Sequence, residues 1–312
     1  MRIVFFGTPD FAVPTLDQLV ASRHQVVRVV SRPDKPVGRD QVVTAPAVVE
    51  AAARHGLEVW QPPSLKSEQA TAEFAALGAD AAVVVAYGRM IPSALLAVPR
   101  HGFVNLHPSL LPRHRGPSPI QWALVCGDRS TGVTTMLLDD GMDTGPILLQ
   151  KRIEIDRRDT AEQLAPRLAQ LGATLVVETL DGIEAGTIKP RPQPEDGANL
   201  TPMLRREFGK VDWTMPARQL VNRLRGLTPW PGLYTNFRGS RLKIFGLDEV
   251  LPAPVGEEEP GSVLVADAAG VMVRCGRGTA ARITEMQREG RRRLPADAFQ
   301  IGERVSRGER FG

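Results

Sequence analysis

The run AAVVVA, at residues 81–86, indicates which kind of sheet this chain builds. Its apolar positions are continuous and do not alternate with polar ones, which is typical of a strand covered on both faces. Similar short runs recur at residues 2–6, 25–31, 102–106 and 132–138. Segments with helical periodicity lie between some of them, at residues 11–22 and 45–55. Strands that alternate with helices form βαβ units, so we predict an α/β fold with a doubly wound, mostly parallel sheet.

The second part of the chain has a different pattern. A long helix is predicted at residues 160–184, and the stretch that follows, at residues 186–202, is rich in Pro and Gly, which is typical of an extended linker. A further helix is predicted at residues 217–225. Short apolar runs with Gly and Pro turns then predict a small β-barrel, at residues 233–237, 241–245, 262–266, 271–275 and 281–285. We therefore expect three parts: a first domain at 1–188, a linker at 189–204 and a C-terminal β-barrel domain at 205–312.

Composition excludes several classes of protein. With 42% hydrophobic and 24% charged residues, the chain is neither disordered nor strongly charged. No run reaches about 18 apolar residues, and the first residues lack the features of a signal peptide, so we expect no membrane span and a cytoplasmic location. Cys126 and Cys275 are too few for a disulfide framework or a zinc site. Motifs for dinucleotides, nucleoside triphosphates, metalloproteases and serine hydrolases are missing, and we expect no metal.

The stretch NLHPSLLPRHRGPSPIQWAL, at residues 105–124, predicts a shaped loop. Its prolines prevent a regular helix or a central strand before about residue 120. The loop begins where the strand predicted at residues 102–106 ends, and ligand sites in open α/β sheets lie beyond the carboxyl ends of strands. Asn105 can donate an amide N–H to a developing oxyanion, and His107 can exchange a proton near neutral pH.

A second stretch, TGVTTMLLDDGMDTGPIL at residues 131–148, supplies carboxylates. Glycines at positions 141 and 145 allow tight turns that aim Asp143 back at a neighbouring strand end. Asn105, His107 and Asp143 from adjacent strand ends would form a site for acyl transfer to an amine. Each also has a structural interpretation that stays open: a turn residue, a hydrogen-bond donor within a loop, and a side chain that caps a turn.

Several motifs resemble those of the methionyl-tRNA formyltransferase family: FGTPDFAVPTL near the start, YGRMIP at 87–92, the two stretches quoted above, and WPG at 230–232. The resemblance covers nearly the whole chain and implies the formyltransferase variant of the Rossmann fold. It implies that Asn105, His107 and Asp143 are catalytic. The reaction would transfer a formyl group from 10-formyltetrahydrofolate to the α-amino group of initiator methionyl-tRNA, for the initiation of translation. Folate contacts are implied for Ser109, Leu110, Leu111 and Pro112, and for the backbone at Met90, Ile91 and residues 140–142.

The resemblance also implies a tRNA contact at Arg39, which keeps a basic position of the family. Asp40 and Gln41 stand where the family often has lysines, which weakens the expected contact of this loop. Residues 205–312 contain 19 Lys and Arg against 13 Asp and Glu, whereas residues 1–204 contain 20 against 22. The C-terminal domain is therefore expected to bind tRNA, in a monomeric enzyme, although a solvated Arg-rich surface explains the charge equally well.

Three alternatives remain at this point. A glycinamide ribonucleotide formyltransferase would share the three residues but would leave the basic C-terminal part unexplained. A formyltransferase of amino-sugar nucleotides is closer in length but would lack the C-terminal basic excess. A non-catalytic RNA-binding protein would have no reason to keep Asn105, His107 and Asp143 together. The charge state in which His107 begins the reaction also stays open.

Overall fold

The computed structural model describes residues 1–38 and 41–312. The chain forms two compact units. Unit 1 consists of Met1–Pro119, Ser130–Glu154 and Ala165–Thr201, and unit 2 of Ile120–Arg129, Ile155–Leu164 and Pro202–Gly312. Two short internal segments thus belong with the C-terminal part of the chain, although the sequence around them reads as part of the α/β domain. None of the helices in the described ranges combines the length and the apolar character needed to cross a membrane.

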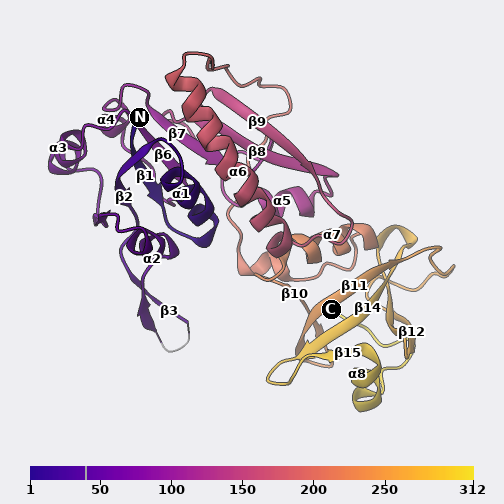
Figure 1. Ribbon diagram of the computed structural model, residues 1–312. Coiled ribbons are helices and arrows are strands. Elements are labelled where there is room, and N and C mark those ends of the chain that lie inside the picture. The colour runs from indigo at the N-terminus through magenta and orange to yellow at the C-terminus, as the bar shows by residue number, and fades with distance from the viewer. Residues whose placement is uncertain (39–40) are drawn as a thin grey trace. The chain divides into compact units, whose positions relative to one another are not determined.

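Unit 1 is built on a seven-stranded sheet (Figure 1). In sheet order its strands are β5 (Val59–Trp60), β2 (Gln25–Val30), β1 (Arg2–Gly7), β6 (Ala81–Val85), β7 (Phe103–His107), β8 (Ser130–Leu137) and β9 (Ile147–Glu154). The first five are parallel to their neighbours, while β8 and β9 each run antiparallel to the strand before them. The predicted α/β fold with a mostly parallel sheet is confirmed. The strand β9, which follows the second motif, was not predicted.

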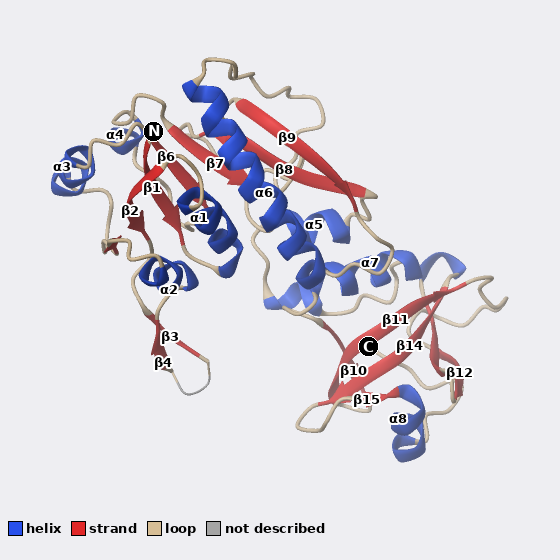
Figure 2. Cartoon of the chain, in the orientation of Figure 1, coloured by secondary structure: helices blue, strands red, loops and turns tan. Residues whose placement is uncertain are grey.

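Helices cover both faces of this sheet, as the buried, unalternating strands require (Figure 2). The helices that begin in unit 1 are α1 (Val13–Val20), α2 (Ala47–Arg54), α3 (Glu68–Ala76) and α4 (Ser93–Leu96), and α6 (Ala161–Glu184) continues into it from unit 2. On one face of β7, Leu106 packs against Gly172 of α6. On the other face, Phe103 joins a cluster with Phe74 of α3 and Leu95 of α4. Asn105 and His107 alternate with Leu106, so they lie on the face with Phe103.

The antiparallel direction of β8 corrects one expectation. We expected Asp143 to follow a strand end adjacent to the end of β7, as in a parallel pair. Instead, Leu137 at the end of β8 pairs with Val104 at the start of β7, and His107 pairs with Thr134. Leu137 lies three positions after Thr134 along the strand, a distance of about 10 Å. The loop at 138–146 therefore has to return along β7 before Asp143 can reach His107.

A two-stranded hairpin extends from unit 1 between β2 and α2. It pairs β3 (Lys35–Val37) with β4 (Val42–Thr44), and Val42 and Val43 are largely exposed. The predicted tRNA contact Arg39, together with Asp40, lies outside the described residues.

Unit 2 contains a six-stranded antiparallel sheet. Its strands are β10 (Leu233–Phe237), β11 (Ser240–Val250), β14 (Ala280–Arg288), β13 (Gly270–Arg274) and β12 (Val263–Asp267), with β15 (Leu294–Pro295) paired to β14. Its helices are α5 (Pro119–Val125), α7 (Ala217–Leu227) and α8 (Ala296–Glu303), and short 3₁₀ helices occur in the chain at Asp10–Ala12, Arg206–Gly209 and Gly276–Gly278. The strands predicted after residue 230 are all confirmed, and β11 and β14 are longer than expected.

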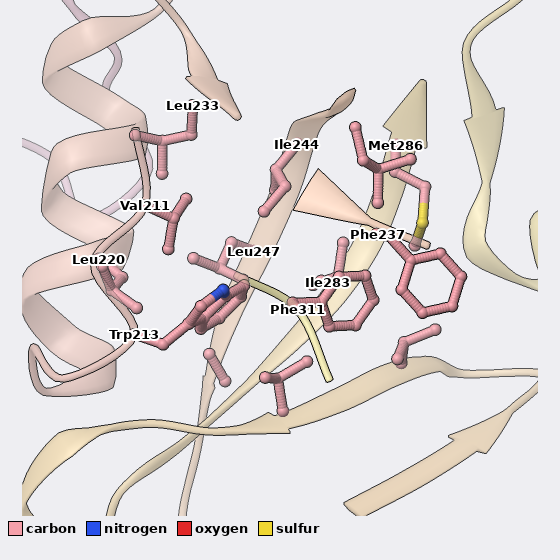
Figure 3. Packing of buried hydrophobic residues seen from close by; sticks show 14 of the residues in the cluster. Val211, Trp213, Leu220, Leu233, Phe237, Ile244, Leu247, Ile283, Met286 and Phe311 are labelled. Carbon is pink, nitrogen blue, oxygen red and sulfur yellow. The ribbon is translucent and has the colours of Figure 1, made fainter. Parts of the chain in front are cut away.

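The last residues of the chain lie between the two edge strands of the sheet of unit 2. Among the described residues no ladder joins β10 to β12, but Phe311 bridges Phe237 and Arg310 bridges Ser262. Inside the curved sheet, α7 and the strands enclose one apolar core (Figure 3). Phe311 packs there with its ring centroid 4.7 Å from that of Phe237. Over the described residues the sheet is an open path from β10 to β12 and not the closed barrel that we expected, and the last residues of the chain link its two edges through single bridges.

Candidate active site

Strand β7 presents two polar side chains on a face that is otherwise apolar. Asn105 is 9% exposed and His107 is 5% exposed, and the backbone of Asn105 pairs with Val84 of β6 and Met136 of β8. Within residues 1–38 and 41–312, the side-chain amide of Asn105 makes no hydrogen bond. Buried amides normally have partners, and an amide N–H without one can donate to a ligand oxygen.

Both ring nitrogens of His107 face oxygen atoms. Nε2 lies 2.9 Å from the carbonyl oxygen of His114, and Nδ1 lies 3.5 Å from Oδ2 of Asp143. The contact with the carbonyl requires an N–H at Nε2, because a carbonyl oxygen only accepts hydrogen bonds. The carboxylate on the other side stabilises positive charge on the ring when a proton moves. The structure thus brings His107 and Asp143 together and places Asn105 two residues away on the same strand face.

Asp143 is held by its own loop and by the loop after β7. Its carboxylate accepts a hydrogen bond of 2.7 Å from the backbone N–H of Gly116. Its backbone is in the left-handed region, with φ of 55°, which residues other than glycine rarely adopt. A Cβ on Gly145 would lie 1.8 Å from the carbonyl oxygen of Leu137. Gly145 is needed because the backbone passes so close to β8, which is a more specific reason than the turn flexibility that we expected.

The turn at Ser109, Leu110, Leu111 and Pro112 is held from within the protein. Ser109 is fully buried, and its hydroxyl donates to the carbonyl of Arg113 at 2.6 Å. Thr134 of β8 donates to the carbonyl of Ser109 at 2.7 Å and accepts from the N–H of Leu111 at 3.2 Å. Leu111 is also buried, so the side chains of Leu110 and Pro112 are the half-buried ones that this turn can offer to a ligand.

Exposed apolar side chains surround the same loops. Met90 is 63% exposed, Met142 is 49% exposed and Leu200 is 67% exposed. A Cβ on Gly116 would lie 2.9 Å from Leu200 and 3.4 Å from the sulfur of Met142, so these two side chains meet above the backbone that binds Asp143. The hydroxyl of Ser93 donates to Asp140 at 2.5 Å and ties the segment after Met90 to the loop at 138–146. This apolar rim suits a flat organic ligand.

The described part of the chain contains no group of three or more His, Cys, Asp or Glu side chains arranged to bind a metal ion. The site itself offers an amide donor, an imidazole and a carboxylate. Such a set stabilises an oxyanion and moves protons between two amines.

Residues 189–204 take part in the site, which their sequence did not indicate. We expected a linker, yet Gln193, Asn199 and Thr201 bond to the two loops that carry the site. The sequence could not show this, because a stretch rich in Pro and Gly has the same composition whether it is a free linker or lies along the surface of a domain.

Unit 2 carries the basic surface that its charge predicted. A cleft of about 1050 Å³ includes Arg241, Arg288, Arg291 and Arg292 in its lining. Several arginines of this unit are neutralised; Arg288 pairs with Glu303, and Arg293 pairs with Glu285 and lies over the ring of Phe245. The ion pairs of the described residues involve neither Arg291 nor Arg292, so these two leave uncompensated positive charge at the cleft.

Comparisons with known proteins agree with both units. Residues 1–180 match the family "Formyl transferase", and residues 203–304 match "Formyl transferase, C-terminal domain". The chain is 45% identical over its whole length to the full-length methionyl-tRNA formyltransferase of Acidobacterium capsulatum. It is 47% identical to that of Anaeromyxobacter dehalogenans over 93% of both chains.

A solved structure of similar fold is that of WlaRD, a sugar 3N-formyltransferase, in the presence of dTDP and 5-N-formyl-THF. The match has a TM-score of 0.67 at 17% identity and covers 94% of this chain and 99% of WlaRD. Identity at this level shows the shared fold alone. The identity to the curated relatives over full length shows more: the chain belongs to the methionyl-tRNA formyltransferase family.

Proposed function

We propose that this protein transfers the formyl group of 10-formyltetrahydrofolate to the α-amino group of initiator methionyl-tRNA in the cytoplasm, as a monomer. The observation that carries the proposal is the contact of His107 with Asp143, beside an Asn105 amide that has no partner among the described residues. This set suits acyl transfer to an amine, and the curated relatives named methionyl-tRNA formyltransferase specify the acceptor.

In the proposed mechanism, 10-formyltetrahydrofolate supplies a formyl group that is activated because its nitrogen leaves as an aryl amine. The α-amino nitrogen bonds to the formyl carbon, and negative charge develops on the formyl oxygen. Asn105 donates its amide N–H to this oxygen, an effect of about 3 kcal/mol for one preorganised donor. His107, held by Asp143, assists the transfer of the proton from the attacking nitrogen to the leaving nitrogen as the C–N bond breaks.

The folate would bind against the turn at Ser109–Pro112 and the apolar rim. Leu110 and Pro112 are half-buried, and Met90 and Met142 are exposed, so together they provide an apolar surface for a pterin ring. The backbone at Ile91 and at residues 140–142 would supply hydrogen bonds to the ring edge. WlaRD, which was solved in the presence of 5-N-formyl-THF, has a similar fold, and this supports a folate donor for this chain.

The tRNA would bind in part through the uncompensated arginines of unit 2. Arg291 and Arg292 are exposed and can neutralise backbone phosphates. Arg39 is proposed as a second contact on the basis of its position in the sequence. Contacts to phosphates carry no sequence information directly, so both positions would contribute affinity more than the choice of the initiator tRNA.

An acceptor comparison tests the proposal. The purified protein is given radiolabelled 10-formyltetrahydrofolate with charged initiator tRNA, glycinamide ribonucleotide or an amino-sugar nucleotide. We expect transfer to Met-tRNA at a kcat/KM at least about a hundredfold above that for the small amines, because only the tRNA uses the basic surface. Preferred transfer to either small amine would replace the proposed acceptor. Binding of tRNA without any transfer would instead indicate an RNA-binding protein.

A further inference from the structure

The segment at residues 191–201, which we call the strap, runs across two loops. One is the loop after β7, which places the carbonyl of His114 against His107, and the other is the loop at 138–146, which carries Asp143. The strap starts with a bridge between Arg191 and Ile147 at the beginning of β9. Near its end Arg115 bridges Leu200, and the N–H of Thr201 donates to the carbonyl of Arg115 at 2.8 Å. The hydroxyl of Thr201 also donates to the carbonyl of Pro117 at 2.7 Å. The strap therefore belongs to the structure of unit 1 along its length.

Gln193 joins the two loops through its side-chain amide. Its Nε2 donates to the carbonyl of Asp143 and to the carbonyl of Gly145, each at 2.8 Å. Its Oε1 accepts a hydrogen bond of 2.9 Å from Nε of Arg115. One half-buried side chain thus connects the Asp143 loop to the loop after β7.

Asn199 holds the residue whose carbonyl contacts His107. Its Oδ1 accepts a hydrogen bond of 2.7 Å from the backbone N–H of His114, and its own carbonyl accepts one of 3.0 Å from Arg115. The carbonyl of His114 in turn faces Nε2 of His107 at 2.9 Å. A single residue therefore separates Asn199 from the imidazole ring.

The two residues that the strap binds, His114 and Asp143, have an unfavourable backbone conformation. His114 has φ of 58° and Asp143 has φ of 55°, in the left-handed region. Residues other than glycine remain in this region when surrounding contacts hold them there, and such positions cluster at functional sites. The side chains of Asn199 and Gln193 supply such contacts directly, one at His114 and one at Asp143.

We propose that Gln193 and Asn199 are positioning residues, which hold His114 and Asp143 so that His107 keeps its orientation between a carbonyl and a carboxylate. Neither amide touches the ring of His107. Their effect on the reaction therefore acts through the loops, and the inference rests on the proposed function for its kinetic consequence. Misplacement of a reacting group by about 1 Å can cost a hundredfold in rate.

Variants of similar volume test the proposal in the full-length protein. Asn199→Leu and Gln193→Met remove the hydrogen bonds while keeping the side-chain size, and each is expected to lower kcat by roughly tenfold. KM for Met-tRNA and for the folate should stay within about twofold, because transition-state geometry changes and ground-state contacts do not. Asp196→Asn, at an exposed position of the strap, is the matched control and should behave like wild type.

Two conservative variants separate the individual hydrogen bonds. Asn199→Asp keeps the acceptor for His114 and should recover most of the lost kcat. Gln193→Glu keeps the acceptor for Arg115 but places a carboxylate oxygen against the carbonyls of Asp143 and Gly145, so it should remain slow. A merely structural role would give equal losses in thermal stability and no such difference between the two conservative variants.

A second readout does not depend on the acceptor. The chain has five histidines, and their ring signals can be followed by NMR in the free protein. Asn199→Leu should move the signals of His107 and His114 and leave those of His24, His55 and His101 in place. Unchanged His107 signals together with wild-type kcat in both volume-matched variants would overturn the proposal. If wild-type protein does not formylate Met-tRNA, the proposed function fails, and the NMR result alone decides whether the strap orients His107.

Discussion

Nδ1 of His107 lies 3.5 Å from Oδ2 of Asp143, although β7, which ends at His107, and β8, which precedes Asp143, run in opposite directions. The contact depends on the return of the loop at 138–146 along β7. Three features of the loop environment permit this return: a left-handed backbone at Asp143, a close passage at Gly145 and the N–H of Gly116 that receives the carboxylate. The backbone around the pair is therefore as important as the two side chains.

Replacement of Gly145 by alanine tests this dependence. The new Cβ would lie 1.8 Å from the carbonyl oxygen of Leu137, so the loop has to move away from β8. We expect Gly145→Ala to lower the thermal midpoint by several degrees and to reduce kcat strongly, because Asp143 shifts with the loop. Gly302→Ala in α8 is the control for stability, since no atom outside its own stretch of helix lies within 4 Å of its Cβ position and alanine favours helix. Wild-type activity in Gly145→Ala would show that the loop position is not critical.

Much of the fold followed from local patterns in the sequence. Continuous apolar runs predicted β1, β2, β6, β7 and β8, and short runs with Gly and Pro turns predicted the strands of unit 2. The direction of β8 could not be predicted, because strand residues of both directions look alike once both faces are buried. β9 had only a weak sequence signal, a short apolar run at residues 147–149 after a Gly-Pro pair, because the residues that follow are mostly polar.

The site could be predicted only in part. Asn105 and His107 share a face because they are two residues apart in a strand, which is a local property. Other parts of the site depend on contacts between segments far apart in the sequence. These are the contact of Asp143 with His107, the hydrogen bonds from Gln193 to the Asp143 loop, and the contact of the His114 carbonyl with His107. The placement of residues 120–129 and 155–164 in unit 2 has the same origin, since Arg225 of α7 binds the carbonyls of Asp156 and Asp159.

The basic cleft of unit 2 is expected to contribute to tRNA affinity. Arg291→Ser and Arg292→Ser should each raise KM for Met-tRNA by several fold and reduce the slope of log affinity against log salt by roughly 0.7 to 0.9. Arg310→Ser is the matched control, because Arg310 is similarly exposed but is neutralised by Glu259 at 2.5 Å. Equal salt slopes in wild type and in the Arg291→Ser, Arg292→Ser double variant would place the phosphate contacts elsewhere.

The stability of unit 2 should depend on pH through Glu258. A hydrogen bond from the buried Arg274, supported by one from Arg307, lowers the pKa of Glu258 from its ordinary value of 4.5 to about 2. The ionised carboxylate is thus favoured in the folded state, and its contribution is present above pH 4.5 and is lost as the pH falls toward 2. Glu258→Gln should lower the thermal midpoint at pH 7 and have a much smaller effect near pH 2, where the carboxylate is protonated to a large extent in the folded state as well as in the unfolded state.

The exposed neighbour variant Glu257→Gln is the control for this series and should match wild type at both pH values. A deficit of Glu258→Gln that is as large near pH 2 as at pH 7 would mean that packing, and not the charge of Glu258, is responsible.

The most direct test of the central claim is single-turnover formyl transfer to Met-tRNA by wild type and by His107→Ala, with both substrates saturating. The account predicts that wild type formylates the tRNA and that His107→Ala is slower by roughly a hundredfold or more, with the fold and tRNA binding intact. Asp143→Ala should fall to a similar level, since the two residues act on one proton transfer. Turnover of His107→Ala within about twofold of wild type would contradict the account, because it would mean that the pair held between β7 and the returning loop does not carry the reaction.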